Sequence, residues 1–273
     1  GTGALPVVLS AWFYRIPVII HESDAAPGLT NLLSARFAAR VAVSFERATN
    51  YFDPAKTAWV GTPIRRELLD DPVDKELAKK ELNFNENNPL LLVLGGSQGS
   101  QRINEFMVSN LSELLKDVQV LHQTGRKNYA DVQKLSRAAL INTPLKTEIE
   151  KRYQAVPYLY LNNLKIARAA ADLVVGRAGS GAISELAAFG KPAILIPLAE
   201  SGRDHQRANA REFAKAGGGV VIEESNLLAG VFLSQLRLIL KNPETLSKMS
   251  AASAKFWKPN AAEAIAKEIL NLS

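Results

Sequence analysis

The sequence predicts an α/β fold in which buried parallel strands alternate with helices. Short apolar runs such as 90–94 and 193–197 have the composition of strands that are buried on both faces of a parallel sheet. These runs are followed by segments in which apolar residues recur at helical spacing. Glycine-rich or polar loops follow several of the strands, as expected where ligands bind at the carboxyl ends of a parallel sheet.

The composition is that of an ordinary globular protein. The chain has 273 residues, of which 47% are apolar and 22% charged, and its formal net charge is +6. No stretch approaches the ~20 apolar residues needed to span a bilayer. Since the chain has no cysteine, a disulfide scaffold, a cysteine-ligated zinc and a cysteine nucleophile are excluded. The mild basic balance suits an anionic small molecule or an anionic membrane surface, and no Lys/Arg run indicates nucleic acid as a partner.

The first segment of the chain is predicted to contain three strands and one helix. The apolar runs 16–20 and 40–44 have the length of strands, and 58–60 is a third, shorter one. Pro27 and Gly28 precede apolar residues that recur at positions 29, 32, 33 and 37, which predicts a helix.

A charged helix, expected at 75–82, separates this segment from the rest. Turns marked by Pro63 and Pro89 flank the helix, which is where a domain boundary is expected. We therefore expect an incomplete first domain, a hinge, a complete second domain and a C-terminal helix that returns toward the first domain. Their predicted bounds are 1–64, 65–88, 89–258 and 259–273.

The second segment is a regular series of strand and helix patterns. Its apolar runs have the length of buried strands. The expected strands and extended pieces are 89–94, 118–121, 155–159, 173–175, 193–197 and 219–222. The expected helices are 103–115, 131–140, 164–171, 182–189, 207–216, 227–240, 243–255 and 261–270. This alternation predicts right-handed βαβ units in a doubly wound sheet.

Three loops that follow strands of the second segment are candidate binding loops. In 95–100, three glycines precede a helix N-terminus and suit a phosphate, although a tight turn explains them equally well. In 176–185, Glu185 stands about one turn into a helix, where a carboxylate binds ribose hydroxyls or stabilises the helix end. The loop 197–209 offers many hydrogen-bonding side chains to a sugar, or is simply solvated.

A polar cluster also follows the strand at 16–20. His21, Glu22 and Asp24 suit acid–base chemistry or a metal. The chain has only three histidines, far apart, and no Asp-x-Asp pair, so a metal clamp on a nucleotide diphosphate is not expected. The absence of a Gly-x-Ser-x-Gly elbow argues against a hydrolase. Together, the loops predict a site for a nucleotide-diphosphate sugar.

Several ordered motifs relate this site to a known family. The motifs are 16–22, 27–31, 61–65, 95–100, 177–185 and 204–206 with Asn209 and Ala210. In this order, over roughly residues 5–217, they resemble the MurG family of bacterial transferases. The resemblance implies the GT-B fold, in which two Rossmann-like domains face a cleft. It also implies an inverting transfer of N-acetylglucosamine from UDP-GlcNAc to lipid-linked muramoyl-pentapeptide (lipid I to lipid II), with neither metal nor cofactor.

The resemblance also implies which residues bind the nucleotide. Leu161, through its backbone, and Ser180 with Gly181 would lie near the uracil. Glu185 would hold the ribose hydroxyls.

The diphosphate would be held by a neighbouring loop. Ser97 and the amides of Gln98 and Gly99 would bind its oxygens, supported by Arg65 from the hinge. Arg177 would lie in the same cleft.

The sugar and the acceptor would meet residues from both domains. His205 and Gln206 would contact the donor sugar, where the family often has Gln in place of His205. Asp24 and Asn31 would line the acceptor side, and Glu22 is the best remaining candidate for the catalytic base.

One departure from the family is large. The family begins with a strand and a Gly-Gly-Thr-Gly-Gly-His loop, which is tied to acceptor diphosphate binding and catalysis. Neither has a counterpart in this sequence. We therefore expect an N-terminally incomplete chain that exposes an apolar face and associates as a homo-oligomer through its first domain. The implied location is cytoplasmic, at the inner face of the plasma membrane. The alternatives are a non-catalytic UDP-sugar-binding half-enzyme that needs a partner chain, and a UDP-GlcNAc 2-epimerase.

Overall fold

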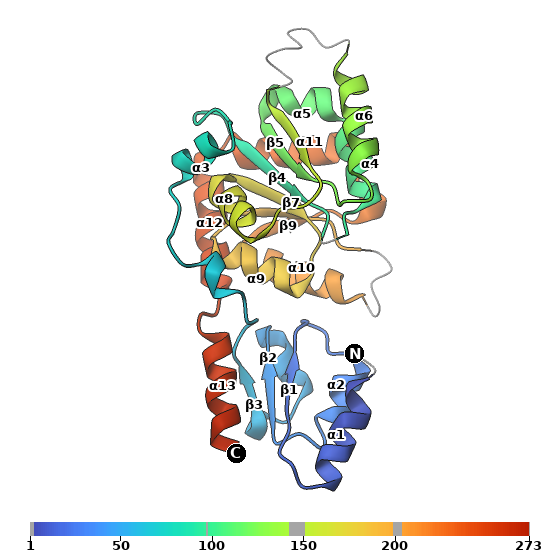
Figure 1. Cartoon of the computed structure of the whole chain (residues 1–273), viewed down its shortest axis with the longest axis vertical. Helices are drawn as coiled ribbons and strands as arrows, with labels where there is room; N and C mark the ends of the chain where they lie inside the picture. The colour runs from blue at the N-terminus through green and yellow to red at the C-terminus, as the bar shows by residue number, and fades with distance from the viewer. Residues whose placement is uncertain (1–2, 97, 142–150, 199–203, 273) are drawn as a thin grey trace.

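The chain forms two parallel sheets with helices on their faces. The computed structural model describes residues 3–96, 98–141, 151–198 and 204–272. The smaller sheet lies at one end of an elongated molecule and the larger sheet at the other (Figure 1). The α/β class that the sequence predicts is confirmed.

The first domain is built on three parallel strands in the order β1-β2-β3. The strands are β1 (Ile19–Glu22), β2 (Arg40–Val43) and β3 (Thr57–Trp59). Helices α1 (Ala4–Phe13) and α2 (Leu29–Ser34) lie on one side of this sheet and the C-terminal helix α13 (Ala261–Leu272) on the other (Figure 1). Val8 of α1 is buried with Ile20, Val41 and Val43, so the helix completes the small core.

The second domain is built on six parallel strands in the order β6-β5-β4-β7-β8-β9. The strands are β4 (Leu90–Leu94), β5 (Gln119–Gln123), β6 (Tyr153–Val156), β7 (Leu173–Gly176), β8 (Ala193–Leu195) and β9 (Gly219–Val221). The helices are α4 (Gln101–Ser109), α5 (Leu111–Asp117), α6 (Tyr129–Leu140), α8 (Leu161–Ala170), α9 (Ser180–Ala188), α10 (His205–Lys215), α11 (Ala229–Leu240) and α12 (Pro243–Phe256). The strand order reverses between β4 and β7, which is where open parallel sheets bind ligands.

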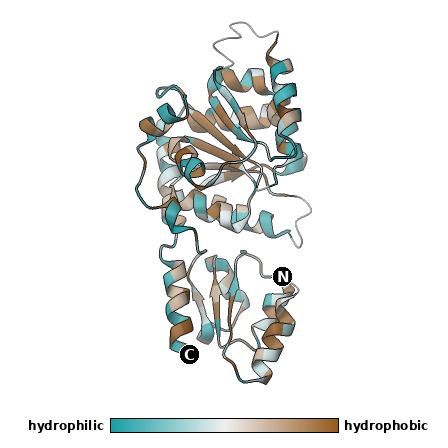
Figure 2. Cartoon of the chain, viewed as in Figure 1, coloured by the Kyte–Doolittle hydropathy of each residue, from teal (hydrophilic) through white to brown (hydrophobic). Residues whose placement is uncertain are grey.

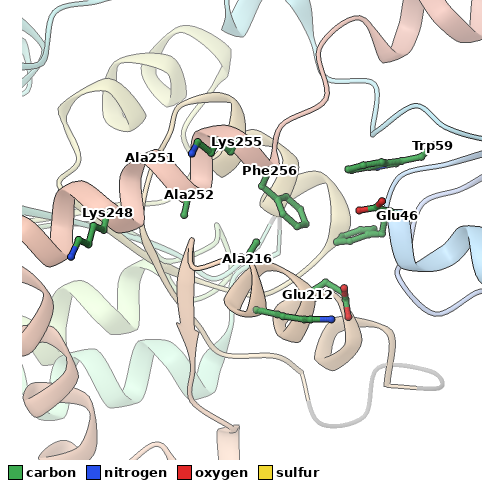
Figure 3. A pocket seen from close by; sticks show the side chains of 11 residues that line it. Glu46, Trp59, Glu212, Ala216, Lys248, Ala251, Ala252, Lys255 and Phe256 are labelled. Atoms are coloured by element: carbon green, nitrogen blue, oxygen red, sulfur yellow. The ribbon is translucent and has the colours of Figure 1, made fainter.

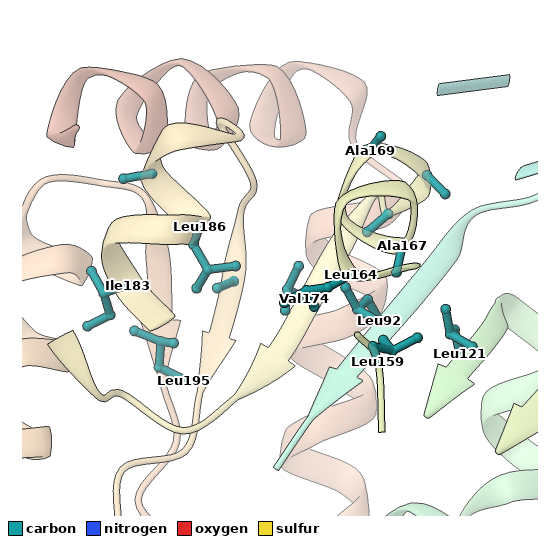
Figure 4. Close-up of a cluster of buried hydrophobic side chains, with 14 of the residues drawn as sticks. Leu92, Leu121, Leu159, Leu164, Ala167, Ala169, Val174, Ile183, Leu186 and Leu195 are labelled. Carbon is teal, nitrogen blue, oxygen red and sulfur yellow. The ribbon is translucent and has the colours of Figure 1, made fainter. Parts of the chain in front are cut away.

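The core of the second domain occupies both faces of this sheet. Leu92 and Val174 pack with α8 and α9 on one face (Figure 4). Leu91 and Val93 pack with α4 and α11 on the other. Because a strand alternates its side chains, β4 needs apolar residues at every position, as its sequence has. Figure 2 shows the resulting apolar band through the centre of the domain.

A short helix and extended segments connect the two domains. In α3 (Lys75–Glu81), Asp74 accepts hydrogen bonds from the backbone N–H groups of Glu76 and Leu77 and so fixes where the helix begins. Lys79 pairs with Asp172 at 2.9 Å, which ties this helix to the second domain. The predicted bounds at residues 64, 88 and 258 stay a prediction.

Four elements differ from the sequence prediction. Helix α1 was not expected, because exposed apolar residues obscure its helical pattern. The helix expected at 103–115 is two helices, since the Asn110 side chain donates to the Phe106 carbonyl at 2.8 Å and ends α4. The strands expected at 16–20 and 155–159 begin at Ile19 and at Tyr153 instead.

Candidate functional site

A cavity of about 280 Å³ opens at the carboxyl ends of β4 and β7. Gly96 follows β4 and Gly176 ends β7, and both line the cavity. A Cβ on Gly176 would lie 2.7 Å from the Leu94 carbonyl oxygen, so only glycine lets these two strands approach here. We call this cavity the switch-point pocket, after the reversal of strand order at which it lies.

The N-terminus of α9 faces the switch-point pocket. Gly179 precedes the helix and supplies no side-chain cap, and Gly181 and Ala182 line the pocket. The first backbone N–H groups of a helix have no intrahelical partner, and the helix dipole is positive there. Ser180 is the first residue of this helix. This end of α9 therefore offers donors to an anionic or carbonyl group in the pocket.

Glu185 lines the pocket between two arginines. One carboxylate oxygen accepts a hydrogen bond from Arg168, and the other lies 3.9 Å from Nη2 of Arg65. Both arginines line the same pocket. A carboxylate held in this way has a fixed orientation, which is what two adjacent ribose hydroxyls require of their acceptor.

Arg168 was not expected in the site. It is 3% exposed, and its Nε and Nη1 have no hydrogen-bond partner among the residues that the structure describes. Burial lowers the pKa of this guanidinium, and the charge of Glu185 opposes that effect. No sequence signal pointed to Arg168, because it lies in a helix pattern that predicts only core packing.

Arg177 holds loops together at the rim of the pocket. Its guanidinium donates to Ser100 Oγ at 2.7 Å, to the Ile196 carbonyl at 3.1 Å and to Glu224 at 2.7 Å. Since these partners come from three separate segments, the expected site residue Arg177 joins the loops that follow three strands. Its side chain is 12% exposed, so little of its surface is left for a ligand.

The loop after β4 contributes backbone to the pocket. Ser97 lies outside the described residues. Gln98 and Gly99 belong to the turn that leads to α4. Gly99 has φ +79°, and a Cβ there would lie 2.1 Å from the Thr124 carbonyl oxygen, so the turn requires glycine. Gln123, which was not expected, lines the pocket and donates to the Gly96 carbonyl at 3.2 Å.

Leu161, the remaining residue predicted to contact the nucleotide, begins α8. Its neighbours Tyr158, Leu159 and Leu164 line the pocket, and the amide of Leu159 is held by Gln123 at 2.9 Å. The predicted backbone contact thus falls within the segment that closes one wall of the pocket.

His205 and Gln206 begin α10, beside the switch-point pocket. Gln206 Oε1 accepts hydrogen bonds from the amides of Ala178, at 3.3 Å, and Leu198, at 3.1 Å. His205 Nδ1 donates to the carbonyl of Ala26, at 2.8 Å, in the first domain. These two residues therefore hold loops from both domains.

The residues predicted to line the acceptor side form a hydrogen-bonded turn after β1. Glu22 is 3% exposed and accepts from the amides of Asp24, at 3.0 Å, and Gly28, at 3.1 Å, and from Asn31 Nδ2, at 2.8 Å. This arrangement shapes the turn and brings Glu22, Asp24 and Asn31 together. The role of Glu22 as a base stays a prediction.

A second, larger cavity of about 630 Å³ lies between the domains. Figure 3 shows Trp59 and Glu46 of the first domain on one side and Phe256 of α12 on the other. Among the described residues, it shares no lining residue with the switch-point pocket, and it lies away from the ends of β4 and β7. The lysines that line this larger cavity are exposed surface groups. We therefore place the site at the smaller pocket.

The described residues contain no group of three or more His, Asp or Glu side chains placed to hold a metal. Within the same residues, no helix combines the length and apolar character that crossing a membrane requires.

The fold and the pocket together define a two-domain glycosyltransferase architecture. The profile "Glycosyltransferase family 28 C-terminal domain" matches residues 90–268, and "Glycosyltransferase family 28 N-terminal domain" matches residues 1–43. The chain belongs to glycosyltransferase family 28.

Individual relatives agree with this assignment. The chain is 39% identical to the UDP-N-acetylglucosamine–N-acetylmuramyl-(pentapeptide) pyrophosphoryl-undecaprenol N-acetylglucosamine transferase of Thermoanaerobacter sp. (strain X514), over 100% of this chain and 73% of the relative. The crystal structure of Acinetobacter baumannii MurG superposes with a TM-score of 0.77 at 27% identity, over 99% of this chain and 72% of that one. This confirms the GT-B type of fold.

A different enzyme class shares the fold at lower similarity. The UDP-GlcNAc 2-epimerase of Neisseria meningitidis superposes with a TM-score of 0.66 at 15% identity, over 97% of this chain and 72% of that one. At this identity the likeness concerns the fold alone.

Proposed function

We propose that this chain transfers N-acetylglucosamine from UDP-GlcNAc to N-acetylmuramyl-(pentapeptide) pyrophosphoryl-undecaprenol. The observation that supports this best is the switch-point pocket, in which an uncapped helix N-terminus, Arg65 and an oriented Glu185 face one space. These groups match the carbonyl, phosphate and ribose parts of a nucleotide-diphosphate sugar. The name of the 39% identical relative supplies the sugar and the acceptor.

In this proposal the nucleotide binds along the wall formed by α8 and α9. The backbone at Leu161, Ser180 and Gly181 holds the uracil, and Glu185 accepts hydrogen bonds from the ribose hydroxyls. The diphosphate lies at the glycine turn of Gln98 and Gly99, with Ser97. Arg177 supports it indirectly, because that side chain fixes the loops around the pocket.

The reaction we propose inverts the anomeric carbon. The acceptor oxygen forms a bond to this carbon while the bond to the diphosphate oxygen breaks, and a base takes the proton of the acceptor hydroxyl. Arg65 and the turn amides stabilise the negative charge that develops on the departing UDP. His205 and Gln206 contact the donor sugar, Asp24 and Asn31 line the acceptor side, and Glu22 is the proposed base.

We further propose that the first domain contacts an anionic membrane surface, on the cytoplasmic side of the plasma membrane. The end of α1 exposes Trp12, Phe13, Tyr14 and Ile16 beside Arg15. Aromatic and apolar side chains next to a cation suit the interface of an anionic bilayer. Flotation with anionic vesicles tests this contact, and light scattering tests the predicted homo-oligomer.

The test of the proposed function combines calorimetry with a transfer assay. UDP-GlcNAc is titrated into the chain, and UDP release is then followed with the lipid-linked acceptor present. We expect saturable binding that Glu185→Ala abolishes and Glu185→Gln weakens, because a ribose diol loses its acceptor. Glu263→Ala, on exposed α13, is the matched control and keeps wild-type affinity.

Each other outcome contradicts the proposal in a defined way. Binding without transfer would favour the half-enzyme that needs a partner chain. Conversion of UDP-GlcNAc in the absence of acceptor would favour a 2-epimerase. No binding, or equal binding by Glu185→Ala, would overturn the assignment of the pocket.

A further inference from the structure

One face of α10 carries three polar contacts between the two domains. His205, Asn209 and Glu212 lie four and three residues apart, so they share this face of the helix. His205 Nδ1 donates to the Ala26 carbonyl at 2.8 Å, and Glu212 pairs with Arg47 at 3.0 Å. Between them, Asn209 makes the buried contact.

Asn209 uses both ends of its amide to join three segments. Its Oδ1 accepts from the Ala25 amide at 2.7 Å. Its Nδ2 donates to Asp24 Oδ1 at 2.7 Å and to the Ala178 carbonyl at 3.3 Å. Asp24 and Ala25 belong to the turn of the first domain, and Ala178 belongs to the loop that follows β7 at the switch-point pocket. A single side chain therefore connects the turn, the loop and α10.

These hydrogen bonds are costly to lose. Asn209 is 0% exposed, so a missing partner would leave a polar group buried without compensation. The bond to Asp24 is charge-assisted, and such bonds are shorter and stronger than neutral ones. On the other side, Glu22 accepts from the Asp24 amide at 3.0 Å, so the turn reaches Asn209 already shaped.

We propose that Asn209 and Asp24 form a latch that fixes how far the two domains close. Both act as positioning residues, because the latch sets the distance between the turn of the first domain and the switch-point pocket. The consequence for catalysis rests on the proposed function, since a misplacement of about 1 Å between donor and acceptor reduces the rate about 100-fold. The domain geometry itself does not depend on that function.

The test measures the distance between the domains without any substrate. Because the chain has no cysteine, Arg36→Cys and Lys134→Cys place two spin labels at defined sites, in the first and second domains. Both positions are exposed and lie outside the proposed site. Pulsed electron paramagnetic resonance then gives the distribution of distances between the labels.

We expect a single narrow distribution for the labelled parent. Asn209→Ala and Asp24→Ala should broaden it and shift it to longer distances, while thermal unfolding shows that the variants are folded. Asp24 is half-buried, so its variant keeps the test open should Asn209→Ala fail to fold. Asn128→Ala, which removes a bond of similar length to the Thr124 carbonyl within the second domain, is the matched control and should keep the parent distribution.

An exchange of the two residues separates the latch from general destabilisation. Asn209→Asp alone places two carboxylates against each other and should give the broadest distribution. Combining it with Asp24→Asn restores one donor and one acceptor and should narrow the distribution again. The latch is overturned if the single alanine variants keep the parent distance distribution. It is also overturned if the distance distribution of the double variant is as broad as that of Asn209→Asp alone. In the transfer assay, Asn209→Ala should lose about 100-fold in rate while keeping its affinity for UDP.

Discussion

The two domains bury their apolar residues to very different degrees. The second domain has apolar clusters on both faces of its sheet, and its central strand β4 is covered on both sides. The first domain has one small cluster and leaves Trp12, Phe13 and Ile16 exposed to solvent at the end of α1. The difference indicates that the second domain is stabilised by its own core, whereas the first domain depends more on contacts with other surfaces.

The comparison predicts effects of very different size for the same substitution in the two domains. Phe213 is fully buried, and its ring lies 5.3 Å from that of Phe256. Phe213→Ala should lower the free energy of unfolding by about 3–5 kcal/mol, because it leaves a cavity in the second domain. Phe13→Ala, at a ring that is 74% exposed, should cost less than about 1 kcal/mol. Urea unfolding measures both, and equal costs would erase the contrast.

The buried core of the second domain also predicts an acid-sensitive step. Burial lowers the pKa of His122 to about 3, and the ring bonds to Asn104 at 2.9 Å and Tyr153 at 3.0 Å. Because the folded state holds this histidine neutral, its contribution to stability is complete above about pH 6.5 and is lost as the pH falls toward 3. Urea unfolding at successive pH values should show this loss, and His122→Gln should flatten it. If the variant loses stability with falling pH as steeply as the parent, His122 is not the cause of the loss.

A smaller effect should appear in the pocket itself. Arg168→Met removes the buried partner of Glu185, so we expect UDP affinity to fall about tenfold, or about 1.4 kcal/mol. Arg168→Lys keeps the charge, so its affinity for UDP should lie between those of Arg168→Met and the parent. Arg211→Met, at a side chain that is 66% exposed, is the control. Calorimetry measures all three. If Arg168→Met binds UDP as tightly as the parent, Arg168 has no part in orienting Glu185.

Local patterns predicted most of the second domain. Apolar runs and glycine loops lie within a few residues of each other, so β4, its loop and Glu185 were found from the sequence. The roles of Arg168 and Asn209 could not be predicted in the same way, because they depend on partners far along the chain. Asn110 illustrates the same limit at short range, since only its side-chain bond to the preceding turn shows that one predicted helix is two.

The first domain was predicted less well because its signals are weaker. Helix α1 exposes much of its apolar surface, so it lacks the two-sided pattern that identifies helices of the second domain. Glu22 was predicted as a base, which stays a prediction, and the hydrogen bonds around it show in addition that it shapes a turn. A pattern in sequence gives the chemistry that a side chain can perform, and its neighbours decide how it is used.

The most direct test of the central claim is hydrogen exchange of the chain with and without UDP-GlcNAc. The account predicts protection at the loop that follows β7, at the start of α9 and in the segment before α8, all of which line the switch-point pocket. Protection confined instead to the cavity between Trp59 and Phe256 (Figure 3), or no protection at saturating ligand, would contradict it.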